Sequence, residues 1–232
     1  VPSEHFNTVL YTGTGSSLAI TGVGFQPDFA WIKDRTNAYQ HQAFDAVRGV
    51  TKKLHQSTTA AEATDATSLT AFGADGFTVS TNVGLNTNTA SYVAWNWKAN
   101  GSGSSNTVGD INSTVSANTD AGFSIVTYTG TAAANATIGH GLSQTPEMII
   151  VKPRSASGQW AVYTETLGNG KKLELQETAA AGNSSLWNST SPTSTVFTVK
   201  NTSTGDVLDD GKTHLAYAFH SVDGYSKVGS YE

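Results

Sequence analysis

The histidines of this 232-residue chain are the first side chains to test for chemistry, because imidazole binds metals and transfers protons. The six of them show no His-x-x-x-His pair or other spacing typical of metal ligands: His5, His41, His55, His140, His214 and His220. The segment DVLDDG (206–211) clusters carboxylates that could hold calcium, yet it lacks the alternating ligands and terminal Glu of an EF-type loop. It favours a hairpin loop, and we expect neither a metal nor another cofactor.

Two carboxylates, Asp28 and Glu147, each follow a proline and precede an apolar segment. Such a pair could suggest acid–base catalysis, but the two residues occupy the same place in two copies of a repeat, described below. That placement favours a turn or a strand-edge cap. The Gly/Ser-rich stretches, among them GTGSSLA (13–19), lack the Gly-x-Ser-x-Gly elbow of a serine nucleophile. No catalytic constellation stands out, and we expect a protein that is not an enzyme.

The segment FDAVRG (44–49) could hold an ion pair between Asp45 and Arg48. In the second copy, Thr164 and Leu167 replace these two residues. A pair that one copy lacks indicates local structure rather than shared chemistry.

Two tryptophans, Trp160 and Trp187, lie in polar segments and have no aromatic counterpart in the first copy. Aromatic rings on a polar surface stack on sugars or anchor protein contacts. We therefore predict that these two residues contact a glycan or a protein partner.

The chain is a tandem repeat, because five segments of its first half recur in the same order in its second half. The matching pairs are FNTVLYTGTG (6–15) with FSIVTYTGTA (123–132), GFQPDFAWIKDR (24–35) with LSQTPEMIIVKPR (142–154), GVTKKLHQSTTAA (49–61) with GNGKKLELQETAA (168–180), GFTVS (76–80) with VFTVK (196–200), and SYVAWNWKA (91–99) with THLAYAFHS (213–221). We predict a first β-sandwich copy over 1–99, a Gly/Ser/Asn/Thr-rich linker over 100–121, flexible or extended over the surface, and a second copy over 122–224.

Period-two alternation marks the strands. Val93, Trp95 and Trp97 alternate with smaller or polar residues, which predicts a half-buried strand with these three in the core. The second copy repeats the pattern with Leu215, Tyr217 and Phe219, which places His214 and His220 on the outer face. Short strands between Gly- and Asn-rich turns predict an all-β fold of two tandem sandwiches, jelly-roll or concanavalin-like.

The composition limits the partners. Charged residues make up 13% of the chain, the net charge is −5, and there are no cysteines. The basic residues are scattered, so nucleic acid is not an expected partner, and no apolar run is long enough to insert into a membrane. A polar surface with few charges is typical of extracellular or virion β-proteins, which is the location we expect.

The blocks GFQPDFAWIKDR (24–35), FDAVRG (44–49) and VDGYSKVGSYE (222–232) carry a family resemblance. The sequence resembles a repeated β-domain of tail-fibre and virion surface proteins of tailed phages, of the kind found in phages of cyanobacteria and other aquatic bacteria. The resemblance covers nearly the whole chain and implies a structural fibre segment with a lectin-like sandwich.

Three functions follow from these patterns. The first is a structural fibre or filament protein that polymerises with its own copies. The second is a carbohydrate-binding module whose partner is a host cell-surface glycan, and the third is a glycan depolymerase, which needs two carboxylates across one cleft.

The segment 225–232 reads as the opening strand of a third repeat, because KVGSYE (227–232) matches TVLYTG (8–13) when their tyrosines are aligned. Two explanations fit this ending: the sequence is cut from a longer array of repeats, or the strand adds to a sheet edge of another subunit, through Ser226, Lys227, Val228, Gly229, Ser230 and Tyr231.

Overall fold

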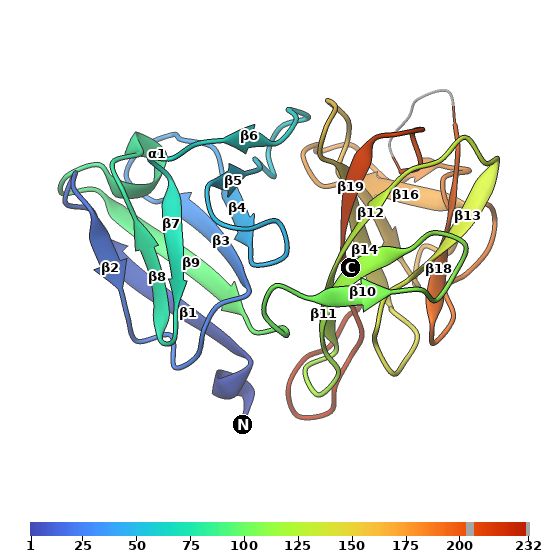
Figure 1. Cartoon of the computed structure of the whole chain (residues 1–232), viewed down its shortest axis with the longest axis horizontal. Coiled ribbons are helices and arrows are strands. Elements are labelled where there is room, and N and C mark those ends of the chain that lie inside the picture. Colours follow the sequence, from blue (N-terminus) through green and yellow to red (C-terminus); the bar gives the residue numbers. More distant parts are fainter. Residues whose placement is uncertain (203–206, 231–232) are drawn as a thin grey trace. The chain divides into compact units, whose positions relative to one another are not determined.

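The computed structural model describes residues 1–202 and 207–230, and its regular structure is almost entirely β-strand (Figure 1). This confirms the all-β class. In the described residues, helix is limited to a 3-10 turn at Pro2–Glu4 and one turn of α-helix, α1 (Val83–Asn86). None of the helices in this described part is long and apolar enough to cross a membrane. The chain divides into two compact units, unit 1 (Val1–Thr58 and Glu62–Ser102) and unit 2 (Thr59–Ala61 and Gly103–Glu232).

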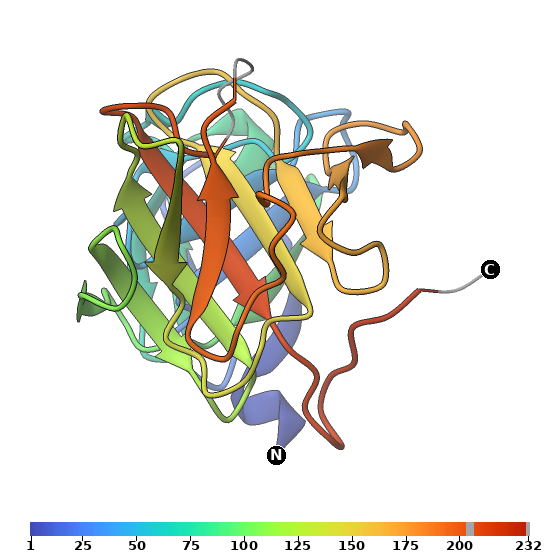
Figure 2. The ribbon, with the colours of Figure 1, turned by 90° about the vertical axis from the view of Figure 1, so that its right-hand side faces the viewer.

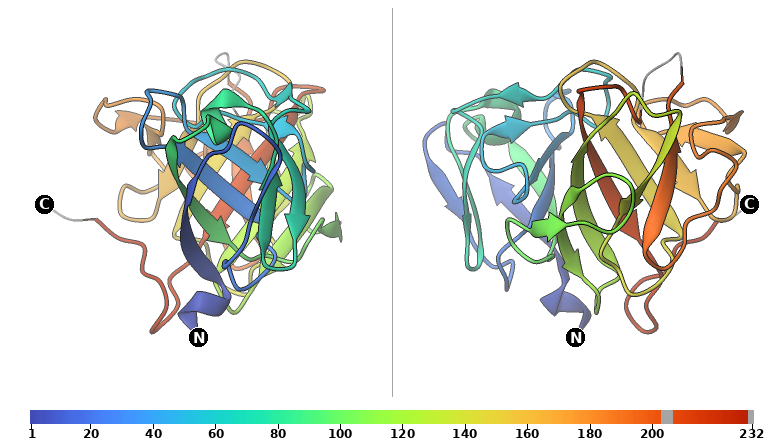
Figure 3. Two further views of the ribbon diagram at one scale, coloured as in Figure 1. Left: turned by 90° about the vertical axis from the view of Figure 1, so that its left-hand side faces the viewer. Right: turned by 45° about the vertical axis from the view of Figure 1, so that its right-hand side comes forward.

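Unit 1 is built from a four-stranded antiparallel sheet, with strands in the order β1-β9-β3-β4, and a three-stranded sheet in the order β2-β8-β7. A short pair, β5-β6, completes it. The left panel of Figure 3 shows the three-stranded sheet lying over the four-stranded one. The strands are β1 (Phe6–Thr12), β2 (Leu18–Ile20), β3 (Phe29–Asp34), β4 (Gln42–Asp45), β5 (Lys52–Lys53), β6 (Ala63–Thr64), β7 (Leu69–Gly73), β8 (Gly76–Val79) and β9 (Ser91–Trp97).

Unit 2 has one long sheet in the order β10-β11-β12-β19-β14-β15-β16-β17 and a separate pair, β13-β18. Figure 2 shows this pair lying over the long sheet. The strands are β10 (Ser104–Asn106), β11 (Ser113–Asn118), β12 (Phe123–Thr129), β13 (Asn135–Gly139), β14 (Met148–Pro153), β15 (Ala161–Thr164), β16 (Lys171–Glu174), β17 (Gly182–Asn183), β18 (Val196–Lys200) and β19 (Thr213–Phe219).

The order β12-β19-β14-β15 in unit 2 repeats the order β1-β9-β3-β4 in unit 1. The registers also match: Phe6 pairs with Trp97 as Phe123 pairs with Phe219. Equivalent backbone hydrogen bonds flank β3 and β14. Before the strand, Asp28 N bonds Trp97 O (2.9 Å) in unit 1 and Glu147 N bonds Phe219 O (2.8 Å) in unit 2. After the strand, Arg35 N bonds Ser91 O (2.8 Å) and Arg154 N bonds Thr213 O (2.7 Å). The segments that match in sequence therefore build one hydrogen-bonding frame.

The core of unit 1 lies between its two sheets and corrects the predicted facing of β9. The alternation itself is present, but the residues of β9 in the core cluster are Tyr92 and Ala94. Val93, Trp95 and Trp97 point to the other face of the sheet and are half-buried. The core has little room for further large rings from β9, because the cluster already holds Phe44, Phe77 and the Tyr11–Tyr92 pair, whose stacked rings lie 4.9 Å apart.

Unit 2 differs, because the middle of β19 is buried on both sides, with Leu215 and Tyr217 0% and 2% exposed. Ala216 and Ala218 of β19 belong to the core cluster, and His214 and His220 on the same side of the strand are 0% and 2% exposed. The prediction that these histidines lie on an outer face is wrong. His214 takes the place of Tyr92 and stacks on Tyr128, with ring centroids 5.0 Å apart and planes at 11°.

A Tyr-Thr-Gly motif recurs at the end of β1 and of β12. Its tyrosine and glycine contact the loop that precedes β9 in unit 1 and β19 in unit 2. The Tyr11 hydroxyl donates to Leu85 O (2.8 Å), and the Tyr128 hydroxyl donates to Val207 O (2.5 Å). Burial raises the pKa of both tyrosines, so each hydroxyl keeps the proton that it donates. A Cβ on Gly13 would lie 2.2 Å from Thr87 O, and one on Gly130 would lie 2.2 Å from Asp209 O. We call this arrangement the Tyr-Gly clamp.

Much of the segment 100–121, which we predicted as a linker, is regular structure that belongs to unit 2. Two strands form there, β10 and β11, and β11 pairs with β12 over six residues. Ser113 and Val115 are buried within unit 2, and Val115 belongs to its core cluster. The Ser/Thr/Asn composition hid these strands, because main-chain pairing with β12 rather than side-chain hydrophobicity holds them.

The predicted strand over 225–232 is not a strand in residues 225–230. Ser226 forms only an isolated bridge with Val222, and the segment leaves the sheet after β19 (Figure 2). Tyr231 and Glu232 lie outside the described residues. A strand requires a paired neighbour, so the prediction that this segment pairs with another subunit stays a prediction.

Gly130→Ala should destabilise unit 2 by about 1–3 kcal/mol, because the added methyl group overlaps a backbone oxygen that cannot swing away. Gly170→Ala is the matched control, since a Cβ there would meet nothing within 4 Å. Urea unfolding of the two variants and the parent measures the difference. Equal midpoints for both variants would contradict the role of Gly130 in the clamp.

Candidate functional site

The two tryptophans predicted to contact a partner are buried. Trp187 is 2% exposed and belongs to the core cluster of unit 2, where its Nε1 donates to Lys171 O (2.9 Å) and its ring meets Tyr163 edge-on. Trp160 is 1% exposed. Trp187 therefore fills the core of unit 2 instead of facing a sugar, and the contact role of Trp160, which lies outside that cluster, stays a prediction. Polar neighbours suggested exposure for Trp187, but the loop turns its indole inward and leaves Ser185 and Ser189 outside.

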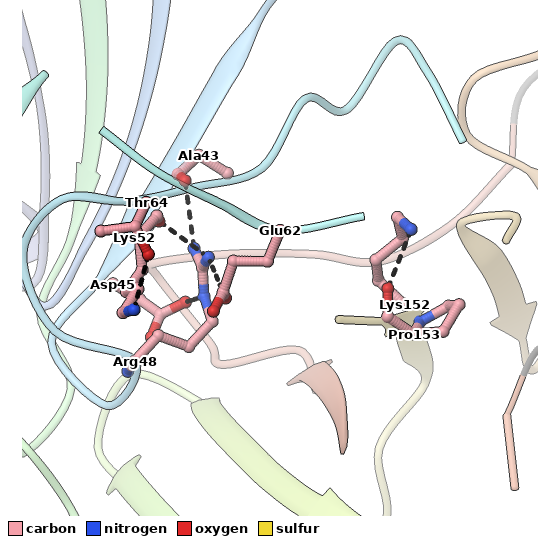
Figure 4. A network of polar contacts seen from close by, with 8 residues as sticks. All are labelled: Ala43, Asp45, Arg48, Lys52, Glu62, Thr64, Lys152 and Pro153. Atoms are coloured by element: carbon pink, nitrogen blue, oxygen red, sulfur yellow. Dashed lines mark hydrogen bonds and ion pairs between the residues drawn. The ribbon is translucent and has the colours of Figure 1, made fainter. Parts of the chain in front are cut away.

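A buried ion network surrounds Arg48 in unit 1, as Figure 4 shows. Its Nε lies 2.5 Å from Asp45 Oδ2, and its Nη1 lies 3.0 Å from Glu62 Oε2. Nη1 and Nη2 also donate to the backbone oxygens of Lys52 (2.9 Å) and Ala43 (3.0 Å). The side chains of Arg48 and Asp45 are fully buried.

This network joins the turn after β4 to the β5-β6 pair. Arg48 donates at least four hydrogen bonds to protein oxygens, which is the arrangement of a structural guanidinium rather than one that awaits a ligand. Unit 2 makes the same turn with Thr164 and Leu167, and Gly168 N bonds Thr164 O (3.1 Å) as Gly49 N bonds Asp45 O (3.1 Å). The interpretation of the pair as local structure fits this geometry.

The repeated carboxylates and lysines are also tied to the frame. Asp28 Oδ2 accepts from Ala99 N (2.8 Å), and Glu147 Oε2 accepts from the Ser221 hydroxyl, so both cap the strand end as predicted. Lys152 is fully buried and donates to Pro153 O (2.9 Å; Figure 4).

Two buried histidines of unit 2, His140 and His214, are neutral. His140 Nε2 donates to Thr193 O (3.1 Å) while its Nδ1 accepts from Leu142 N (3.2 Å), which selects one neutral tautomer. Burial lowers the pKa of His140 to about 4, and the pKa of His214 to about 4 as well, with the Lys152 charge adding to the second shift. In the described part of the chain, no three metal-ligating side chains come together.

An open polar hollow of about 280 Å³ lies at one end of the long sheet of unit 2. Arg154, directly after β14, faces hydroxyl and amide side chains that come from four other strands or their flanks. The lining is Ser105, Asn112, Ser113, Thr114, Thr127, Tyr128, Thr129, Arg154 and Thr213. Hydroxyls, an amide and a guanidinium are groups that hydrogen-bond to polar, acidic ligands.

Sequence reasoning missed this hollow. Ser105 and Thr114 belong to the segment predicted as a linker, and they reach Thr127 only because β10 and β11 extend the sheet beyond β12. Unit 1 has Arg35 at the position of Arg154, but no strand there corresponds to β11 in the described residues. No pattern in the sequence predicts that β11 pairs with β12.

The loss of stability when the buried network is broken should depend on which charged partner remains. Arg48→Leu leaves the Asp45 carboxylate buried without its guanidinium and should cost about 3 kcal/mol or more. Asp45→Thr with Arg48→Leu, which copies the unit 2 turn, should cost less than Arg48→Leu alone. Chemical denaturation of the single and double variants measures both values. A double variant that is less stable than Arg48→Leu would contradict the account.

Comparison with known proteins yields one family match. The family model described as "Domain of unknown function (DUF7483)" matches residues 1–232. The search of curated proteins found no match.

Proposed function

This chain belongs to the DUF7483 family, and we propose that it is a non-enzymatic structural protein of a fibre or filament, of the phage tail-fibre kind. In this proposal its two units are tandem β-sandwiches, jelly-roll or concanavalin-like, and its main partners are further copies of itself. Its place is outside the cell or on a virion surface.

The observation that carries the proposal is the repetition of one frame. Four long strands, their register and the Tyr-Gly clamp recur in both units, although the side chains on the frame differ. Proteins built by repeating one structural unit extend in one dimension, and each unit supplies stability and an edge rather than a unique pocket. The turn at Asp45 and Arg48 has diverged in unit 2 while the frame around it has not, as expected where architecture is the shared requirement.

The surface composition agrees with this use. Only 13% of the residues are charged, so Ser, Thr, Asn and Gly make up much of the exterior. A polar surface with few charges depends little on pH and salt, because there are few charge pairs to screen. Such a surface suits a fibre exposed to natural waters.

Self-association tests this proposal. Sedimentation velocity over a wide concentration range, followed by electron microscopy of the most concentrated sample, should show oligomers or filaments that grow with concentration. A chain that sediments as a monomer at every concentration and forms no filament would contradict the proposal.

A second candidate function, binding of an acidic saccharide, is favoured by the hollow around Arg154. A guanidinium that faces several hydroxyls can pair with a carboxylate or sulfate while the hydroxyls bond the sugar. A receptor-reading fibre segment would combine both functions, with a host surface glycan as ligand.

Arg154→Ala should remove binding to acidic glycans on a glycan array. Arg35→Ala is the matched control, because Arg35 follows β3 as Arg154 follows β14 but lies in unit 1. Binding that falls with both variants, or with neither, would rule out the hollow as the site.

A further inference from the structure

Strand β1 is an edge strand, whereas its counterpart β12 is not. In the long sheet of unit 2, β12 pairs with β19 on one side and with β11 on the other. In unit 1, β1 pairs with β9, and no strand of the described residues pairs with its other side. The same frame is therefore covered along this edge in one unit and open in the other.

The open edge presents main-chain groups of alternate residues. Gly13 N bonds Ala90 O (2.8 Å) and Lys98 N bonds His5 O (2.8 Å), so the odd-numbered residues of β1 direct their groups to β9. In an antiparallel ladder the intervening residues direct their N–H and C=O groups away from that partner. The groups on the free side therefore belong to Phe6, Thr8, Leu10 and Thr12.

Unit 2 shows how such an edge is filled. The equivalent residues Phe123, Ile125 and Thr127 pair with Asn118, Ser116 and Thr114 of β11, respectively. The covering strand is antiparallel, six residues long and free of large apolar side chains except Val115. The frame thus accepts a short polar strand along this edge, through main-chain bonds.

Two features of β1 bear on whether it accepts a strand. Leu10 is 65% exposed, and an apolar side chain on an open, seven-residue edge strand favours pairing with another chain. The second feature opposes pairing. The Asn7 side chain accepts from Thr8 N (2.9 Å), and this hydrogen bond must be exchanged for one to the incoming strand. Among the described residues, no neighbouring side chain caps the other three outward positions in this way.

We propose that the free edge of β1 is an acceptor site for a strand of a second copy of this chain, supplied by the segment Ser226–Ser230. The inference rests on the proposed function, since it names the surfaces that would join the copies. In the structure, residues 227–230 of the donor segment form no strand, and Lys227, Gly229 and Ser230 are exposed. In sequence they precede Tyr231, which aligns with Tyr11 and Tyr128 of the opening strands of the two units.

Disulfide trapping tests the pairing, because the chain has no cysteine of its own. Leu10→Cys is mixed with a second variant that carries Lys227→Cys, Val228→Cys or Gly229→Cys, so that a bond between the two variants can only join two copies. A disulfide needs Cα atoms within about 7 Å, and at least one pair should give a linked dimer under mild oxidation. Val83→Cys replaces Leu10→Cys in the control, since Val83 is 55% exposed and lies on α1.

A charge on the edge provides the second arm. Leu10→Lys should weaken self-association by about tenfold or more, because a lysine on an edge strand opposes pairing, whereas Val83→Lys should leave it unchanged. Circular dichroism checks that both variants fold. Self-association that persists with Leu10→Lys, with no cross-linking above the Val83 control, overturns the inference and leaves the proposed function standing. A parent chain that is monomeric at every concentration overturns both.

Discussion

The structure depends on the Tyr-Gly clamp, the bond from the first long strand of each unit to the loop before the last. A buried tyrosine hydroxyl donates to a loop carbonyl, and a glycine two residues later lets the loop backbone approach. Because that loop leads into β9 or β19, the clamp fixes where the central strand of each sheet begins. The pairing of that strand with both of its neighbours then follows in register, in both units.

Around this frame the two units have diverged in ways that the frame tolerates. Tyr92 stacks on Tyr11 in unit 1, and His214 stacks on Tyr128 in unit 2 with nearly the same geometry. The buried ion pair of Asp45 and Arg48 is absent from the matching turn of unit 2. The largest difference lies at the edge, where β11 covers β12 while β1 is open. That difference separates a completed sheet from one able to accept another strand.

The sequence predicted the all-β class and the positions of the long strands, because alternation and repetition are local signals. It did not predict which side of β9 faces the core, since Val93, Trp95 and Trp97 are the more apolar set yet lie opposite the cluster. The choice depends on what the second sheet already fills. The strands β10 and β11 and the hollow at Arg154 escaped prediction because main-chain pairing and long-range approach create them. Trp187 was misjudged because its polar neighbours point away from the core that its indole fills.

The central claim is that one frame has an open edge in unit 1 and a covered edge in unit 2. Amide hydrogen exchange of the dilute chain, read residue by residue, tests it most directly. The N–H groups of Leu10 and Thr127 occupy equivalent outward positions, and only Thr127 has a paired strand beside it. The account predicts fast exchange at Leu10 and slow exchange at Thr127, with Leu10 becoming protected in the assembled state. Equal protection of the two amides in the dilute chain, or no gain at Leu10 on assembly, would contradict it.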